Sequence, residues 1–397
     1  MKIISINSGS SSLKFKLFNM PYEEILCSGS IEKIGCTDAI FTIKFHNKKE
    51  QIFLTIKDHQ EAIKLFLSFI LENKIINSWD EIDGVGHRIV QGGELFQESV
   101  ILTDEDIDQI ESLKYLAPLH THANVLGIRL FKKMLPQIFQ VGVFDTTFHK
   151  NIPQKNFLYA TPYEWYQKYK IRKYGFHGIS YQYVSERVEQ IFNKSNLKMI
   201  VCHIGNGVSL AAIENGKSID TSMGLTPLEG VPMGTRSGNI DPTIISFISQ
   251  KENKNIEEIL DILNKKSGLL GISGISNDCR VLEQMVSRGD KKSILSFEIQ
   301  IKRIVDYIAS YYVLLKGIDA LVFTAGIGEN SSFVRKEIIK HLSILNIYID
   351  DKLNEEAVVK EQIISNEKSN VQVIVVPTNE ELKIAQNVFS LTKNKIK

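Results

Sequence analysis

The chain has 397 residues, of which 43% are apolar and 23% charged, and its formal net charge at pH 7 is +1. One hydrophobic core rarely serves so long a chain, so we expect two domains. The balanced charge argues against a nucleic acid or a membrane surface as the partner and leaves small molecules or protein.

Cysteine usage and hydropathy indicate a cytoplasmic protein. The four cysteines are scattered, without the spacing of a metal or redox site, which suits a reducing compartment. The N-terminus has no apolar core of signal-peptide length, and no apolar run approaches the ~20 residues of a membrane-spanning helix.

The N-terminal part of the chain predicts strand, small-residue turn, strand. Residues 2–6 are apolar, residues 7–12 read Asn-Ser-Gly-Ser-Ser-Ser, and residues 13–18 alternate as a half-buried strand does. An amphipathic helix is predicted over 58–72, with Asp58 and Glu61 as a capping pair.

The next segments carry candidate polar groups. A strand into a Gly-Gly turn is predicted over 83–93 and places His87 and Arg88 mid-strand, with room for a ligand beside the turn. Thr103 is predicted to cap another helix, and residues 117–122 form a loop before a helix over 123–133. An apolar strand begins at 141 and has Asp145 at its carboxyl end, where catalytic groups of open α/β sheets lie, although Asp145 could equally cap a turn.

The stretch from 199 to 242 repeats the N-terminal plan. A buried strand over 199–202 ends in His203-Ile-Gly-Asn-Gly207, and Asn215-Gly216 predicts a hairpin. A Gly-, Thr- and Ser-rich loop then carries one cation, Arg236, which suits recognition of an oxyanion. A purely structural hairpin fits the stretch equally well, but the recurrence favours two similar lobes facing one cleft.

The C-terminal part adds a third strand-and-glycine turn. After helices over 242–249 and 256–264 come a Gly/Ser loop (271–280) and a helix over 299–315. The strand from 320 enters a glycine turn (326–330) and opens a helix over 332–341, whose N-terminus suits a phosphate or ribose. A last strand is predicted over 371–376, and Thr378 with Glu381 has the spacing of a capping box, which would leave Glu380 free.

These segments together contain the groups that phosphoryl transfer needs. Glycine turns at Asn7, Gly205 and Gly326 are typical of backbone N–H groups that bind a polyphosphate. Cations without obvious partners and carboxylates able to hold Mg²⁺ accompany them. The cations are Arg88, His177, His203, Arg236 and Arg280, and the carboxylates are Asp145, Asp278 and Glu380. A histidine-metal hydrolase is an alternative because His120-Thr-His122 has ligand-like spacing; it would lose activity to a chelator and regain it with Zn²⁺.

Ten motifs in order over the full length resemble the acetate kinase family, of the acetate and sugar kinase/Hsp70/actin superfamily. They are NSGSSSLKF (7–15), VGHRIVQGGE (85–94), VFDTTFH (143–149), YGFHG (174–178), HIGNG (203–207), DTSMGLTPLEG (220–230), MGTRSG (233–238), SNDCR (276–280), GIGEN (326–330) and PTNEEL (377–382).

The resemblance implies an α/β fold of two similar ribonuclease-H-like (actin-like ATPase) domains around a central cleft, and a homodimer. The N-terminal lobe would span 1–149 plus a returning helix at 383–397, and the nucleotide-binding lobe 150–382. The implied reaction is ATP + acetate ⇌ ADP + acetyl phosphate, by direct in-line transfer. The cleft would close on the substrates and exclude water, which competes for the phosphoryl group.

The resemblance also implies roles for matching residues. Arg88 and Arg236 would grip acetate and the transferring phosphoryl group, His177 would stabilise its equatorial oxygens, and Asp145 would orient the arginine and metal waters. The metal, Mg²⁺ or Mn²⁺ in its place, would be held by Asn7 and Glu380.

Two groups of matching residues would bind the substrates. The acetate pocket would comprise Arg88, Val90, Leu119, Phe176 and Pro227. The nucleotide site would comprise Lys14, His203, Ile204, Gly205, Asn206, Gly207, Asp278, Cys279, Arg280, Gly326, Ile327, Gly328, Glu329 and Asn330.

The motifs depart from the usual family pattern beside these positions, at Thr121, His122, Ile179, Tyr181, Asn239 and Ala325. The departures bear on pocket shape and nucleotide preference more than on the reaction. A propionate kinase is the alternative enzyme, because one methylene is worth only ~1–3 kcal/mol. A non-catalytic nucleotide-binding protein on the same fold is a second alternative, which loss of Arg236, Asp145 or His177 would have indicated.

Overall fold

The computed structural model describes residues 1–395, and for Pro118 and Leu119 it describes the backbone only. The chain forms two compact units, which we call unit 1 and unit 2. Unit 1 comprises residues 1–147 and the chain from Asn379 onwards, and unit 2 comprises residues 148–378. The prediction assigned residues 379–382 to the second lobe, whereas here they belong to unit 1. Within the described residues, no helix is both long and apolar enough to cross a membrane.

Unit 1 is built on an eight-stranded sheet of order β5-β4-β3-β2-β1-β6-β8-β7. Strand β1 pairs antiparallel with β2 and parallel with β6, and β6 pairs parallel with β8. The strands are β1 (Lys2–Ser8), β2 (Ser12–Asn19), β3 (Glu24–Glu32), β4 (Ala39–Phe45), β5 (Lys48–Leu54), β6 (Ile82–Ile89), β7 (Val100–Ile101) and β8 (Phe139–Phe144).

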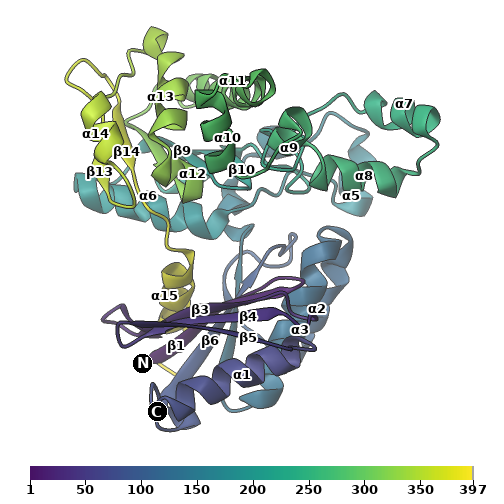
Figure 1. The fold of residues 1–397 in the computed structure, drawn as a ribbon, viewed down its shortest axis with the longest axis vertical. Helices are drawn as coiled ribbons and strands as arrows, with labels where there is room; N and C mark the ends of the chain where they lie inside the picture. The colour runs from purple at the N-terminus through teal and green to yellow at the C-terminus, as the bar shows by residue number, and fades with distance from the viewer. Residues whose placement is uncertain (396–397) are drawn as a thin grey trace. The chain divides into compact units, whose positions relative to one another are not determined.

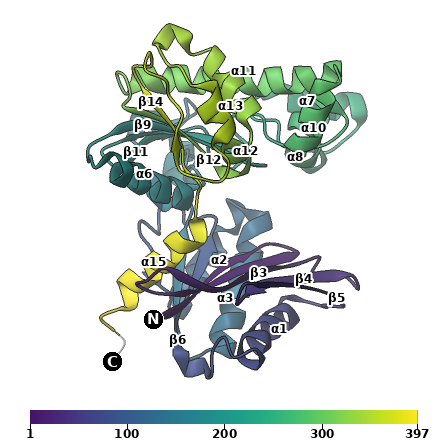
Figure 2. The ribbon, with the colours of Figure 1, turned by 60° about the vertical axis from the view of Figure 1, so that its left-hand side comes forward.

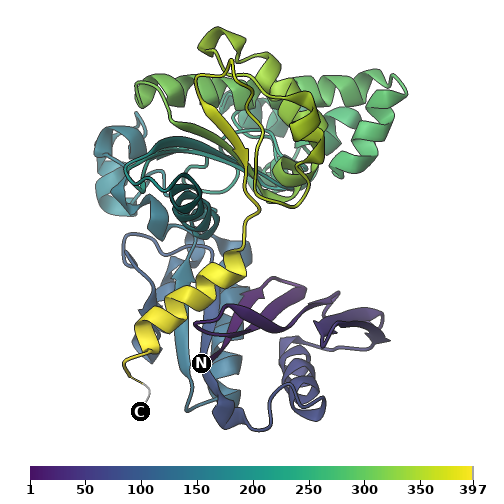
Figure 3. The ribbon, with the colours of Figure 1, turned by 90° about the vertical axis from the view of Figure 1, so that its left-hand side faces the viewer.

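The helices of unit 1 cover both faces of this sheet. They are α1 (His59–Glu72), α2 (Asp104–Ser112), α3 (Pro118–Met134) and α15 (Glu380–Thr392), with 3-10 turns at η1 (Trp79–Glu81) and η2 (Leu113–Tyr115). Helix α1 lies against one face of the sheet (Figure 1). Its Phe66 packs onto Phe15 of β2, with the ring centroids 4.0 Å apart. Helix α15 runs along the opposite face (Figure 3). It approaches β6 closely because the strand has glycine there: a Cβ on Gly86 would lie 2.4 Å from Ile384.

Helix starts in unit 1 follow the predicted capping residues in two cases and differ in a third. Asp58 accepts the N–H of Glu61 (2.9 Å), and Thr103 forms a capping box with Asp106. The predicted loop over 117–122 is wrong, because α3 begins at Pro118. Proline at the first helical position loses no hydrogen bond there, so the helix can begin earlier than the apolar pattern indicates.

Unit 2 repeats the pairing of unit 1 in a six-stranded sheet of order β11-β10-β9-β12-β14-β13. Strand β9 pairs antiparallel with β10 and parallel with β12, which pairs parallel with β14. The strands are β9 (Lys198–Ile204), β10 (Val208–Glu214), β11 (Lys217–Thr221), β12 (Ala320–Thr324), β13 (Gln362–Ile363) and β14 (Gln372–Val375). The predicted duplication is therefore confirmed at the level of strand order.

Helix α6 covers one face of this sheet and α11 the other (Figure 2). The helices after the first sheet are α4 (Gln154–Phe157), α5 (Tyr163–Tyr169), α6 (Gly178–Phe192), α7 (Thr243–Glu252), α8 (Ile256–Lys265), α9 (Gly268–Ser273), α10 (Cys279–Ser287), α11 (Lys291–Leu314), α12 (Ala325–Asn330), α13 (Ser332–Lys340) and α14 (Asp351–Glu356), with 3-10 turns at η3 (Thr147–Asn151) and η4 (Ser343–Leu345). The predicted hairpin at Asn215-Gly216 is present, with φ of 54° and 70°.

Three local predictions in the second half are wrong. Residues 325–330 form the short helix α12 rather than a glycine turn, and α9 extends into the start of the predicted Gly/Ser loop. The capping box at Thr378 is absent: Asn379 caps α15 by accepting the N–H of Leu382, and Glu381 pairs with Lys16 instead (3.1 Å). Asn379, one residue later than Thr378, caps the backbone N–H groups that have no partner within the helix. Glu381 is drawn instead to the charged amine of the nearby Lys16.

Candidate active site

The carboxyl ends of the parallel strands in unit 1 bring one arginine and two carboxylates together. Arg88 lies near the end of β6 and Asp145 directly follows β8, while Glu380 opens α15. Nε and Nη2 of Arg88 donate to the two oxygens of Asp145 at 2.8–3.2 Å. Nη1 of Arg88 lies 3.1 Å from Oε2 of Glu380, and all three side chains are less than one-fifth exposed. The prediction that Arg88 and Glu380 lack partners is wrong.

This buried triad has a net negative charge. Burial alone would lower the pKa of Arg88, but the carboxylates of Asp145 and Glu380 outweigh it and raise that pKa. Burial raises the pKa of Glu380, and the attraction of Arg88 offsets the effect only in part. The arginine is fixed and charged, and the second carboxylate attracts a further cation.

The other predicted residues of unit 1 flank the same edge of the sheet. Asn7 on β1 lies opposite Lys14 on β2. The N–H of Val90 donates to Oδ1 of Asn124 (3.2 Å), whose Nδ2 donates to the carbonyl of Ser8 (3.1 Å). Asn124 of α3 thus ties the ends of β1 and β6 together. Sequence reasoning did not single it out, although it ends the segment PLHTHAN. The side chain of Leu119 lies outside the described residues.

In unit 2, His177 lies at the N-terminus of α6 in a left-handed backbone conformation, with φ of 57°. His149 fixes the residue before His177, because Nε2 of His149 donates to the carbonyl of Phe176 (2.9 Å). Gly175 also has positive φ, and a Cβ there would lie 2.7 Å from the His149 ring. The glycine before His177 is therefore a packing requirement.

A second histidine stacks on the first. Successive β9 side chains alternate between faces, and Met199 and Val201 pack with α6, so His203 also lies on the α6 side. Its ring stacks on that of His177 at a centroid distance of 4.0 Å. Nδ1 of His203 bonds the hydroxyl of Ser180 (2.9 Å), and Nδ1 of His177 bonds that of Ser209 (2.7 Å). The serines were not predicted as site residues, and only the register of β9 and β10 with α6 reveals them.

Arg236 shares its surroundings with His177. Its loop closes on itself, the N–H of Met233 donating to the carbonyl of Arg236 (2.9 Å), and Nη1 of Arg236 lies 3.3 Å from the carbonyl of Pro227. Burial lowers the pKa of Arg236. A Cβ added to Gly207 would lie 3.4 Å from Nε2 of His177 and 3.6 Å from Nη1 of Arg236. An imidazole nitrogen and a guanidinium nitrogen therefore converge on space that Gly207 leaves open.

A hollow of about 670 Å³ in unit 2 has the size of a small-molecule site. It is lined by Asn206, Asn277, Asp278, Cys279, Arg280, Glu283, Gly326, Ile327, Asn330 and Ser331. Seven of these were predicted as nucleotide-binding, and Asn277, Glu283 and Ser331 were not. Arg280 is not without a partner, because it pairs with Asp278 (2.7 Å) at the start of α10.

The remaining predicted nucleotide residues lie outside this lining. Glu329 accepts the N–H of Thr378 (3.0 Å), and burial raises the pKa of Glu329. The carbonyls of Gly328 and Glu329 accept from the fully buried Arg335, at 2.8 and 3.0 Å. Burial lowers the pKa of Arg335 to about 10. Helix α12 is thus anchored from behind by a cation that the sequence did not reveal.

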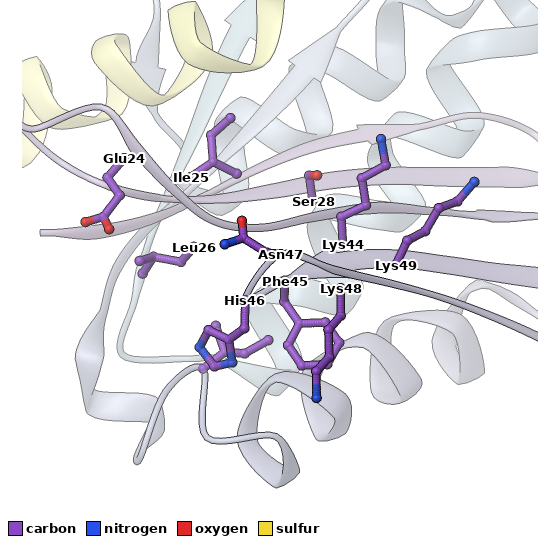
Figure 4. A pocket seen from close by; sticks show the side chains of 11 residues that line it. Glu24, Ile25, Leu26, Ser28, Lys44, Phe45, His46, Asn47, Lys48 and Lys49 are labelled. Atoms are coloured by element: carbon purple, nitrogen blue, oxygen red, sulfur yellow. The ribbon is translucent and has the colours of Figure 1, made fainter.

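A second hollow, of about 580 Å³, lies at the β4–β5 hairpin of unit 1 (Figure 4). It contains none of the predicted site residues. Lys44 and Lys49 point to the opposite side from Lys48 (Figure 4), so its charges do not converge. Among the described residues, no group of three or more His, Cys, Asp or Glu side chains is placed to hold a metal, so His120 and His122 gain no support as ligands.

A duplicated sheet with buried arginines at strand ends and a hollow of nucleotide size is typical of kinases of the actin-like ATPase class. The comparisons specify the family. The sequence pattern of the Acetokinase family matches residues 2–386. The chain belongs to this family, which confirms the prediction from the ten motifs.

Similar proteins span the whole chain. The acetate kinase of Phytoplasma mali is 63% identical over 98% of this chain and 100% of its own. The crystal structure of Porphyromonas gingivalis acetate kinase has a TM-score of 0.93 at 41% identity, covering 98% of this chain and 99% of that one. A propionate kinase from Francisella tularensis subsp. tularensis has a TM-score of 0.94, also at 41% identity, with the same coverage. The predicted fold class and kinase activity are confirmed.

Gly207→Ala tests the convergence of His177 and Arg236. The added methyl would meet both side chains at ordinary contact distances, so the fold should persist while the oxyanion space is filled. We expect turnover to fall about 10²-fold, the scale of a small misplacement at a reacting centre. Kinase assays beside thermal melts measure this. Unchanged turnover in a variant with the wild-type melting temperature would show that the space is not used.

Proposed function

We propose that the protein transfers the γ-phosphoryl group of ATP to acetate in one reversible, Mg²⁺-dependent, in-line step, giving acetyl phosphate and ADP. The observation that carries the proposal is the convergence of Nε2 of His177 and Nη1 of Arg236 on the space beside Gly207. Donors of this kind act on the equatorial oxygens of a transferring phosphoryl group.

The main requirement of this reaction is that the site offsets the negative charges of its two substrates. Acetate is already ionised at neutral pH, so its attack needs no strong general base. The site has to hold two anions together and offset their repulsion, which cationic donors in a dry environment do well. Arg236 in unit 2 and Arg88 in unit 1 are such cations, and His177 adds a ring N–H donor in unit 2.

The acetate would be bound by Arg88, whose guanidinium Asp145 already holds in position (2.8 Å). A preorganised donor binds without first losing side-chain freedom. The methyl group would lie among Val90, Leu119, Phe176 and Pro227, a role that rests on motif position alone.

The nucleotide would occupy the hollow of about 670 Å³ in unit 2, near α12. We place Mg²⁺ at Asn7 and Glu380, with Mn²⁺ as a substitute. One carboxylate and one amide oxygen fit this ion, which usually keeps several waters and binds substrate phosphates. The net negative charge of the Arg88 triad favours a cation there. When bound, Mg²⁺ would neutralise charge developing on the β- and γ-phosphates.

A propionate kinase with the same mechanism is the second candidate, favoured by the similar structure from Francisella tularensis subsp. tularensis. The decisive assay is acyl-hydroxamate formation with Mg-ATP, hydroxylamine and the acids from formate to butyrate. We expect the highest kcat/KM with acetate. A maximum at propionate would keep the mechanism and replace the substrate, and no product from folded protein that binds ATP would overturn the proposal.

Arg236→Ala tests the phosphoryl contact. We expect turnover to fall about 10²–10³-fold, because a charge-stabilising donor is lost, with the fold intact. Arg303→Ala is the matched control, since that arginine is half-exposed on α11 and contacts Asp306. Equal turnover in both variants would remove Arg236 from the mechanism.

We further propose that the protein is a cytoplasmic homodimer. All four cysteines are free thiols, which suits a reducing compartment. Support for a dimer comes from α7 and α8 of unit 2. Helix α7 buries none of its residues in the described chain, although it carries Ile244 and Phe247 at 41% and 59% exposure. Clustered exposed apolar side chains mark interaction surfaces.

Phe247→Glu tests this interface. A charge placed in an apolar contact would be desolvated without a partner, so we expect the variant to become monomeric. Sedimentation velocity measures the change, with Ile344→Glu, at an exposed site on η4, as the control. A monomeric wild type would refute the dimer, and a dimeric Phe247→Glu would refute this face.

A further inference from the structure

In unit 2 the hydroxyl groups of Ser209 and Tyr181 form a chain of hydrogen bonds that ends at Nδ1 of His177. Tyr181 lies in the first turn of α6, four residues after His177, which caps the helix. Both approach Ser209 of β10: Nδ1 of His177 lies 2.7 Å from its Oγ, and Oη of Tyr181 lies 2.5 Å from it. Tyr181 and Ser209 are fully buried.

The protons of these groups can run in one direction, from Tyr181 through Ser209 to His177. Burial raises the pKa of Tyr181, and the hydroxyls of Ser209 and Thr221 lower it only in part, so the phenol keeps its proton. The hydroxyl of Thr221 donates its hydrogen bond to the carbonyl of Leu210 (2.9 Å). If Tyr181 donates to Ser209, the single proton of Ser209 remains for Nδ1 of His177.

We propose that Tyr181 is a positioning residue for the phosphoryl-transfer step: through Ser209 it makes Nδ1 of His177 a hydrogen-bond acceptor, so that the neutral ring carries its proton on Nε2. The inference rests on the proposed function. Nε2 is the ring nitrogen nearest the space beside Gly207, where Nη1 of Arg236 also points. A proton fixed at Nε2 makes the histidine a donor toward phosphoryl oxygens without requiring a second positive charge.

The ring and the hydroxyl of Tyr181 have different contacts, so the role of the hydroxyl can be tested by itself. The ring packs edge-on against His149 at 5.5 Å and near Phe148 at 6.4 Å. Phenylalanine keeps these contacts and removes only the donor.

The first test compares Tyr181→Phe with a matched control. Tyr311 is also buried in unit 2, and its hydroxyl has no hydrogen-bond partner in the described structure, so Tyr311→Phe removes an equivalent atom outside the relay. We expect kcat of Tyr181→Phe to fall about 10-fold, the value of an ordinary hydrogen bond, with KM for ATP and acetate unchanged. Tyr311→Phe should keep the wild-type kcat.

A double-mutant cycle tests whether the two hydroxyls act as one unit. If Tyr181 works through Ser209, the pair Tyr181→Phe with Ser209→Ala should lose no more kcat than Ser209→Ala alone. Multiplied losses would show that Tyr181 acts separately, which would overturn the inference.

A spectroscopic readout makes the inference independent of turnover. The ¹⁵N resonances of His177, assigned by their loss in His177→Ala, report which ring nitrogen carries the proton when the ring is neutral. We expect the Nε2–H form in the wild type and in Tyr311→Phe, and a mixture of both forms in Tyr181→Phe. An Nδ1–H wild type, or an unchanged spectrum in Tyr181→Phe, would refute it.

The two kinds of failure are distinguishable. An inactive wild type with the Nε2–H form would overturn the proposed function and leave the relay standing. If the wild type is active, and Tyr181→Phe changes neither kcat nor the tautomer of His177, the proposed function stands and the relay is refuted.

Discussion

Burying arginine side chains while replacing the hydration that they lose is the constraint on which both units depend. A guanidinium removed from water costs several kcal/mol unless hydrogen bonds replace its hydration. In unit 1 Arg88 meets this cost with two carboxylates, and in unit 2 Arg335 meets it with carbonyl and amide oxygens. Among the described residues, Nη1 of Arg236 contacts the carbonyl of Pro227 and the thioether of Met233 but no carboxylate.

The repeated strand order explains where these charges lie. In each unit the first strand is antiparallel to the second and parallel to a later one, which is β6 in unit 1 and β12 in unit 2. The loops that follow the parallel strands therefore emerge at one edge of each sheet. Unit 1 equips that edge with Arg88, Asp145 and Glu380, and unit 2 equips it with stacked histidines and the hollow beside α12.

A layer of unremarkable polar residues gives these groups their orientation. Asn124 links the ends of two strands, and His149 holds the backbone just before His177. Ser180 joins His203 to Thr378, at 2.9 and 2.8 Å, where the chain leaves unit 2. Each such contact contributes little to the free energy of folding. Together they set the direction of each donor, which decides how strongly the donor acts on a developing charge.

The sequence by itself determined the strands, most helices and the family. Apolar runs and alternation are local, so the strands near 2–6, 13–18 and 199–202 could be predicted, and ten ordered motifs carried the resemblance. Local pattern failed where two caps compete, as at Thr378 and Asn379, and where a helix opens without a clear cap, as at Pro118 and Ala325. Tertiary structure alone decided which charges are paired: Glu380 looked free, yet it lies 3.1 Å from Arg88, nearly 300 residues earlier in the chain. It also decided that Ser209 and Tyr181 stand behind His177, because that depends on how β10 is registered against α6. Pairing and register arise between distant segments, and no local pattern of residues encodes them.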